Sequence, residues 1–207
     1  MGAMRIFRAS GRVAAVLALG LGPALADPLP APAGDFSLKA RLPHGALAEM
    51  AYSQRRMRTE VSKPDVAGTM VALIELDTRR MVMLSPQMPK VALEMPMLPE
   101  YVVGIVTGTG TRTGRSEVAG APCDQWRIDP PAELKGKAVS LEACITPDGI
   151  SLRAEVEIQG SRKMLYEATE LVRGPQDPKL FALPPGVKVV KMPKDKLGLI
   201  PGGALKF

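Results

Sequence analysis

The chain has 207 residues, of which 46% are hydrophobic and only 4% aromatic, and it carries a formal net charge of +6. A chain of this length makes one domain with a hydrophobic core of its own. Its lysines and arginines are spread along the chain, whereas nucleic-acid-binding proteins cluster theirs and interleave aromatic side chains. We therefore expect a single domain and no nucleic-acid partner.

The first 26 residues have the pattern of an export signal. Three arginines precede the apolar run Val13–Leu21, and Ala24 and Ala26 form a small-x-small cleavage site. We predict a signal peptide over residues 1–26, with cleavage after Ala26 and export to the periplasm. The apolar run is far shorter than the roughly 20 residues that span a bilayer, so no permanent membrane span is expected. Cleavage removes three arginines and no acidic residue, which lowers the net charge from +6 to +3.

The mature chain reads as a succession of strands. Residues 27–35 are rich in proline and predict a flexible leader, residues 36–190 the folded domain, and residues 191–207 a loose tail. Within the domain, short apolar segments alternate with turn residues, which is typical of antiparallel strands. The predicted strands are Phe36–Leu42, Met50–Val61, Met70–Leu76, Arg80–Leu84, Val91–Met97, Arg112–Val118, Ala121–Asp129, Val139–Thr146, Leu152–Ile158 and Met164–Val172. They predict a meander of nine or ten antiparallel strands.

Two segments have weak helical character. Leu98–Val106 is expected to form a short helix or a loop lying across the sheet, and Asp177–Leu183 one helical turn. The predicted fold class is therefore mainly β, with one or two short helices.

The only two cysteines are Cys123 and Cys144. They lie in two predicted strands, residues 121–129 and 139–146, that a loop joins. If the hairpin is centred in that loop, the cysteines are directly opposite each other, where Cα atoms are about 4.5 to 5.5 Å apart and a disulfide can form. Such a disulfide agrees with export to an oxidising compartment.

Alternation in the same strands assigns their faces. Leu141 belongs to the apolar row of residues 139–145 and Cys144 to the polar row. Pairing Cys123 with Cys144 therefore places Trp126 opposite Leu141 on the apolar face, and the disulfide on the polar face. A one-residue slip would invert every side chain in this assignment.

The chain offers little for catalysis. Its single histidine, His44, lies between Pro43 and Gly45, which is typical of a surface turn. The glycine-rich segment Thr107–Thr111 is followed by neither a helix nor the lysine that a phosphate loop needs, and no cluster of acids and histidine appears. We expect a protein that is not an enzyme and uses no cofactor.

Methionine is the enriched residue type. Met81, Met83, Met88, Met95 and Met97 fall within seventeen residues. Met81 and Met83 share one strand face, as do Met95 and Met97, which is the alternation that core packing or the lining of a cavity produces. Because thioethers also bind copper(I), copper(I) binding by this cluster is a further hypothesis.

The cysteine segments carry a family resemblance. Val118-Ala119-Gly120, Cys123 and Trp126 are followed by Cys144-Ile145-Thr146-Pro147-Asp148-Gly149, and the domain ends with Phe181–Gly186. Here the chain resembles an uncharacterised bacterial periplasmic family with a V-A-G-x-x-C-x-x-W segment, a C-x-T-x-D-G hairpin and a closing F-x-x-P-x-G. That family is similar to LolA-like lipoprotein-carrier and lipid-binding proteins. The resemblance implies a single curved antiparallel sheet, an open half-barrel whose concave face holds acyl chains under short helices.

These observations lead to two main hypotheses of function. The first is an exported, non-enzymatic protein that binds a lipid or other hydrophobic ligand on the apolar sheet face, through Trp126, Leu141, Met81, Met83 and Met95. The alternative is a protein-interaction module in envelope assembly, which binds an envelope protein partner through an exposed sheet edge. A deep apolar cavity favours the first hypothesis, and a fully packed sheet with a long bare edge favours the second.

Overall fold

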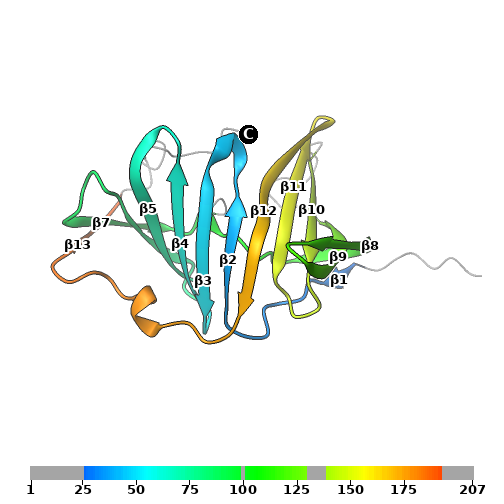
Figure 1. The fold of residues 1–207 in the computed structure, drawn as a ribbon, viewed down its shortest axis with the longest axis horizontal. Helices are drawn as coiled ribbons and strands as arrows, with labels where there is room; N and C mark the ends of the chain where they lie inside the picture. Colours follow the sequence, from blue (N-terminus) through cyan, green and yellow to red (C-terminus); the bar gives the residue numbers. More distant parts are fainter. Residues whose placement is uncertain (1–25, 99–100, 130–138, 193–207) are drawn as a thin grey trace, which may run out of the picture.

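In a computed structural model of the protein, one large, curved and unclosed antiparallel sheet makes up most of the fold (Figure 1). The structure describes residues 26–98, 101–129 and 139–192. The strands are β1 (Asp27–Pro28), β2 (Phe36–Arg41), β3 (Leu47–Ser53), β4 (Arg56–Lys63), β5 (Val66–Glu75), β6 (Arg80–Leu84), β7 (Val91–Pro96), β8 (Thr109–Val118), β9 (Ala121–Ile128), β10 (Val139–Ile145), β11 (Ser151–Ile158), β12 (Ser161–Arg173) and β13 (Lys188–Lys191). The predicted fold class is confirmed.

In the residues that the structure describes, helical structure is confined to short turns. The described part contains the 3-10 turns η1 (Pro43–Gly45) and η4 (Pro178–Phe181). The second agrees with the helical turn predicted over Asp177–Leu183, and the Asp177 carboxylate accepts a hydrogen bond from the Lys179 N–H at its start. Among the described residues, no helix has the length and apolar character needed to cross a membrane.

The sheet consists of two meanders joined edge to edge. Strands β2 to β7 form one meander and β8 to β12 the other, and β12 pairs with β2 to give the order β1-β8-β9-β10-β11-β12-β2-β3-β4-β5-β6-β7-β13. Residues 97–108, called here the crossing segment, connect the two meanders. The alternation predicts one continuous meander, whereas the structure contains two meanders in one sheet.

The predicted strand Met50–Val61 is wrong as one element, because the chain reverses at Gln54-Arg55. Both residues have positive φ, 48° and 62°, and Ser53 pairs with Arg56, so the turn has the two-residue hairpin geometry of type I′. Glycine and asparagine usually occupy such positions. Neither is present here, so the turn has no recognisable sequence signal.

Backbone hydrogen bonds attach residues 27–35, for which a flexible leader was predicted, to the rest of the fold. Asp27 and Pro28 pair with β8, and the Ala33 N–H donates to the Asp148 carbonyl. Gly149 lies close beneath this segment, because a Cβ there would be 2.1 Å from the Ala31 carbonyl oxygen. The signal peptide predicted over residues 1–26 lies outside the described residues except for Ala26.

Residues 174–187, called here the strap, follow β12 and run past the strand ends at the bottom of Figure 1. Arg58 of β4 donates a hydrogen bond to the Leu180 carbonyl. The strap then enters β13, which pairs with β7 in parallel, and this pairing was not predicted. Of the expected tail, residues 191–207, only Lys191, the last residue of β13, and Met192 are described.

An ion pair joins the end of β12 to the turn after β10. The Arg173 guanidinium donates to both oxygens of Asp148, at 2.6 and 2.9 Å. These hydrogen bonds are the main reason why the pKa of Asp148 is lowered from 3.8 to about 2. Because the pKa is lower in the folded state, the pair stabilises the fold above about pH 4 and loses this effect as the pH falls through about 2.

We therefore expect Arg173→Gln to lower the free energy of unfolding at pH 6 and to have progressively less effect below pH 4. Urea denaturation of both proteins at pH 6, 3 and 2 measures this difference, and carboxyl NMR should show a higher Asp148 pKa in the variant. A stability difference that does not change with pH would assign the loss to packing instead.

Candidate functional site

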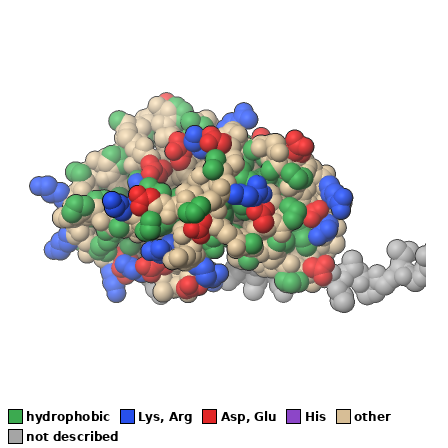
Figure 2. Space-filling model, turned by 60° about the horizontal axis from the view of Figure 1, so that its bottom comes forward, with side chains coloured by type: hydrophobic (Ala, Val, Ile, Leu, Met, Phe, Trp, Pro, Cys, Tyr) green, Lys and Arg blue, Asp and Glu red, His purple; other side chains and the backbone are tan. Residues whose placement is uncertain are grey.

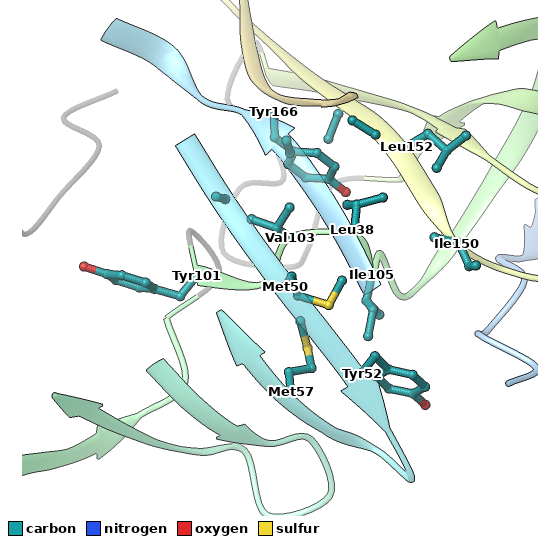
Figure 3. Close-up of a cluster of buried hydrophobic side chains, with 14 of the residues drawn as sticks. Leu38, Met50, Tyr52, Met57, Tyr101, Val103, Ile105, Ile150, Leu152 and Tyr166 are labelled. Carbon is teal, nitrogen blue, oxygen red and sulfur yellow. The ribbon is translucent and has the colours of Figure 1, made fainter. Parts of the chain in front are cut away.

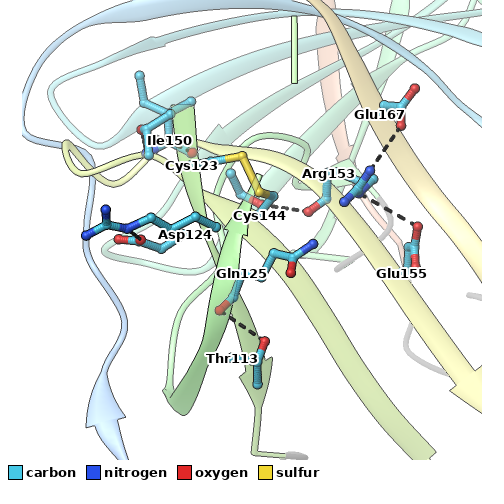
Figure 4. Close-up of a disulfide and its surroundings, with 12 residues drawn as sticks. Thr113, Cys123, Asp124, Gln125, Cys144, Ile150, Arg153, Glu155 and Glu167 are labelled. Atoms are coloured by element: carbon cyan, nitrogen blue, oxygen red, sulfur yellow. Dashed lines mark hydrogen bonds and ion pairs between the residues drawn. A yellow bond between two sulfur atoms is a disulfide. The ribbon is translucent and has the colours of Figure 1, made fainter. Parts of the chain in front are cut away.

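The predicted disulfide between Cys123 and Cys144 is present (Figure 4). Their Cα atoms are 5.4 Å apart and the side chains are 3% and 1% exposed. The register differs from the predicted one, because Cys144 is opposite Gln125 and Trp126 is opposite Ala143. The predicted pairings of Cys123 with Cys144 and of Trp126 with Leu141 as direct neighbours are therefore wrong. The shift is an even number of residues, so Cys123 and Trp126 stay on opposite faces of the strand. The predicted place of the disulfide on a polar face is wrong, because both cysteines are buried in the main hydrophobic core.

Trp126 lies in a small buried cluster of its own, apart from the main core. It packs with Ile128, Ala143 and Ile145, and Leu141 is partly buried against them. The indole is 4% exposed, and the Arg112 guanidinium lies 5.4 Å from its ring centroid. Among the described residues, its Nε1 has no hydrogen-bond acceptor. Trp126 is thus covered, and its N–H is an unused donor.

The methionines do not line an open surface. Met81, Met83 and Met95 are at most 3% exposed and belong to the main core, where Met81 and Met95 are cross-strand neighbours. Met88 is 38% exposed, and Met97 is only partly buried against the core. Their alternation therefore corresponds to core packing, and copper(I) binding stays a prediction.

The crossing segment covers the sheet face that carries the main core, called here the inner face. Val103 and Ile105 lie over Leu38 and Met50 of β2 and β3 (Figure 3). Complete burial of two such side chains contributes roughly 3 to 6 kcal/mol. A ligand on the inner face would have to displace these side chains and would lose their burial energy. This cost lowers its affinity by a factor of about a hundred or more.

Hydrogen bonds hold the crossing segment at Tyr101 and at Gly104. The Thr59 hydroxyl donates to the Tyr101 carbonyl at 3.0 Å, and the Ser151 N–H donates to the Gly104 carbonyl at 2.9 Å. Gly104 has a φ of 83°, and a Cβ there would lie 2.5 Å from the Met50 methyl carbon. A loop lying across the sheet, one of the two predicted forms of Leu98–Val106, is therefore what the described residues of this segment show.

Within the described part of the chain, the outer edge of β8 is largely unpaired. β1 pairs with Thr109 and Gly110 only, so no other described strand lies beside residues 111–118. The turn after β8, Ala119-Gly120, has positive φ at both residues and is flanked by the pair Val118 and Ala121. In such a hairpin the flanking pair is hydrogen-bonded. By alternation, the backbone N–H and C=O groups of Glu117 and Arg115 point outward.

The side chains of this edge are polar and exposed. Arg115 has 86% of its side chain exposed and Arg112 53%, and both guanidinium groups lie near the Asp124 carboxylate, at 3.7 and 3.4 Å. At the opposite end of the sheet, the edge strand β13 is only four residues long and has lysine at both ends, which discourages pairing with another strand. β8 is thus the longer and less protected edge.

Metal-binding side chains do not converge in the described part of the chain. It contains no group of three or more His, Cys, Asp or Glu side chains that could hold a metal ion. His44 lies in the exposed turn η1, as predicted, with a φ of 60°. Charges of both signs are interspersed over the face shown in Figure 2.

No protein-family model and no curated protein matches the chain by sequence. The fold is similar to that of an uncharacterized conserved protein from Thermus thermophilus, with a TM-score of 0.55 and 15% identity over 77% of this chain and 91% of that one. This likeness concerns the fold alone.

The structural neighbours also include MucB, which has a LolA-like fold. The complex structure of Pseudomonas aeruginosa MucA/MucB matches with a TM-score of 0.48 and 13% identity over 76% of this chain and 58% of that one. A structure of MucB in complex with MucA(peri) matches with a TM-score of 0.46 and 12% identity, over 76% and 57%. This chain thus spans less than two thirds of the MucB chains.

The disulfide yields the first prediction of this section. Because it closes a loop with a sequence separation of 21 residues, its loss should cost about 3 kcal/mol of unfolding free energy. We expect this loss on replacing both cysteines by alanine, and a similar loss for the native protein in reductant, measured by urea denaturation. The double variant itself should not respond to reductant. A native protein whose stability is unchanged by reductant would contradict the prediction.

A second prediction concerns the hydrogen bond to the crossing segment. Thr59 is fully buried, so Thr59→Val removes a buried donor at almost constant volume and should cost about 1 to 2 kcal/mol. Hydrogen exchange of the amides of residues 101–106 should accelerate.

The matched control is Thr113→Val, whose hydroxyl donates to the Gln125 carbonyl at an exposed position. It should cost less than about 0.5 kcal/mol and leave the exchange of residues 101–106 unchanged. Equal effects of the two substitutions would mean that the Thr59 bond does not hold the segment.

Proposed function

We propose that this protein is an exported, non-enzymatic interaction module that binds an extended segment of a partner protein along the outer edge of β8. The observation that carries the proposal is the pairing of β1 with only two of the ten residues of β8. The remaining outward N–H and C=O groups can accept another strand, as in other cases of strand addition. The disulfide supports the exported location.

The relative cost of binding favours this edge over the inner face. A ligand on the inner face has to displace the crossing segment, whereas a strand at β8 finds its hydrogen-bonding groups already exposed. The hydrophobic-ligand hypothesis named Trp126, Leu141, Met81, Met83 and Met95. Leu141 is partly buried, and the other four side chains are at most 4% exposed. Strand addition at β8 requires no rearrangement of the core.

The side chains of β8 indicate which partner segments fit. Arg115 and Glu117 lie two residues apart on one face of the strand, and both are exposed. Opposite charges that face each other across two strands contribute roughly 0.2 to 1 kcal/mol per pair. A partner strand with an acidic residue opposite Arg115 and a basic residue opposite Glu117 therefore fits best.

Binding of a hydrophobic ligand is the second candidate function. It is favoured by the unused N–H of the buried Trp126, since a ligand with an oxygen acceptor would satisfy this donor. If the candidate is right, a fluorescent fatty acid should bind, and its binding should weaken on Trp126→Phe, which removes the donor and keeps the aromatic ring. Uptake that is absent, or equal in both proteins, would exclude it.

The edge proposal is tested with a proline scan. Because the Arg115 N–H points outward, Arg115→Pro should keep the fold and block an incoming strand, whereas Ser116→Pro should break the β8–β9 ladder and unfold the hairpin. A photo-crosslinking residue at position 117 should capture a partner protein in the periplasm. The adduct should persist with Arg115→Ala and disappear with Arg115→Pro.

Circular dichroism and thermal unfolding check that Arg115→Pro is folded. The same crosslinker placed at Lys163, an exposed position of β12, should give no such adduct. A folded Arg115→Pro protein that forms the adduct as well as the native one would overturn the proposal, and so would equal capture from Lys163.

A further inference from the structure

A pocket of about 240 Å³ lies between the strap and strands β4, β5 and β6. It is far from the edge of β8 in the order of the sheet, so it is independent of the function proposed above. Six of its nine lining residues are apolar and three are charged. The residues that line it are Arg56, Met57, Leu73, Ile74, Glu75, Arg80, Val82, Phe181 and Leu183.

The apolar wall of the pocket belongs to the outer face of the sheet, opposite the crossing segment. Leu73 pairs with Arg58 and Val82, so its side chain points away from the face that carries its neighbour Ile74. Leu73 and Val82 form a second small core with Ala92. The strap closes this side with Phe181, which is partly exposed, and Leu183, which is 36% exposed.

The charged wall contains one arginine without a carboxylate partner. Arg80 binds Glu75 at 3.3 Å and Glu94 at 3.0 Å, and Lys191 lies 3.8 Å from Glu94. Within the described residues, no carboxylate lies within 4 Å of the Arg56 side chain nitrogens. Among the lining residues, Arg56 and Arg80 stand against the single carboxylate of Glu75, so the pocket lining carries a surplus of one positive charge.

The hydrogen bonds of Glu75 explain why Arg56 has no carboxylate partner among the described residues. Arg56 and Glu75 are cross-strand neighbours in the register of β4 and β5. However, one Glu75 oxygen accepts from Arg80 and the other from the Thr78 hydroxyl at 3.0 Å. The Arg56 guanidinium lies instead over the Phe181 ring, 5.3 Å from its centroid, where a cation–π contact holds it at the pocket.

We propose that this pocket binds a single-chain anionic amphiphile, with a carboxylate or phosphate head on Arg56 and the alkyl chain along Leu73, Val82 and Leu183. Guanidinium groups pair with such heads through two parallel hydrogen bonds. The volume is below the roughly 300 to 1,000 Å³ of pockets for drug-sized ligands, so one short chain fits and a two-chain lipid does not.

The test uses decanoate and decyl phosphate, each below its critical micelle concentration, with decanol and decylammonium as matched probes without the negative charge. Isothermal titration should show binding of one or both anions, and at least tenfold weaker binding of the two other probes. Amide shifts in the NMR spectrum should change around residues 56, 73, 82 and 181–183. Tighter binding of decanoate would identify a fatty acid as the natural source, and tighter binding of decyl phosphate a phosphorylated lipid.

Arg56→Gln should weaken binding of the anions about tenfold or more and leave decanol unchanged, since it removes only the charge-assisted hydrogen bonds. Arg41→Gln, which removes an exposed arginine of β2 outside the pocket, is the control and should have no effect. Leu183→Glu keeps Arg56 but places a carboxylate on the exposed strap, and it should abolish binding of both anions. Decanol binding as tight as decanoate, shifts elsewhere in the protein, or full binding by Arg56→Gln would each overturn the proposal.

Discussion

The pairing of β12 with β2 is the interaction on which the rest of this structure depends. It joins strands from the two ends of the domain, and a hydrogen bond from the Thr169 hydroxyl to the Lys39 carbonyl spans 130 residues of sequence. Without this pairing, the two meanders would be separate sheets with two additional bare edges. With it, they form one curved surface, and the crossing segment that connects β7 to β8 has an inner face to cover.

The two ends of this sheet differ in a way that bears on function. β13 ends the sheet with a short strand flanked by lysines, whereas β8 has ten residues of which the described strands pair only two on its outer side. Unpaired edges expose a protein to unwanted association, and proteins usually shield them. An unshielded edge on an otherwise well-packed sheet is therefore consistent with a surface kept for a partner, as proposed. The exposed charged side chains of Arg112, Arg115 and Glu117 limit unwanted association at this edge.

Strand positions and faces in the second half of the domain were predictable from alternation. The two cysteine strands were located within one residue of their observed ends, and the disulfide was predicted correctly although the register was not. Cys123 and Trp126 were still assigned to opposite faces, because the register error was two residues, an even number. The turn at Gln54-Arg55 was missed because residues other than glycine or asparagine adopt its positive φ values. The pairing of β13 with β7 was missed because four residues carry too little pattern to identify a partner strand.

The sequence by itself determined the fold class, the disulfide and the apolar or polar side of most strands, because these follow from local spacing and side-chain type. Only the tertiary structure decided which apolar residues are accessible. Met81, Met83, Met95 and Trp126 have the composition of a ligand surface, and yet they are buried. The methionines lie in the main core, which combines residues from both meanders and from the crossing segment, and Leu29 and Val106 pack beside Trp126. The same holds for the unpaired Arg56, whose neighbours come from β5 and the strap. Burial and charge pairing depend on contacts between remote parts of the chain, and alternation along one strand carries no information about them.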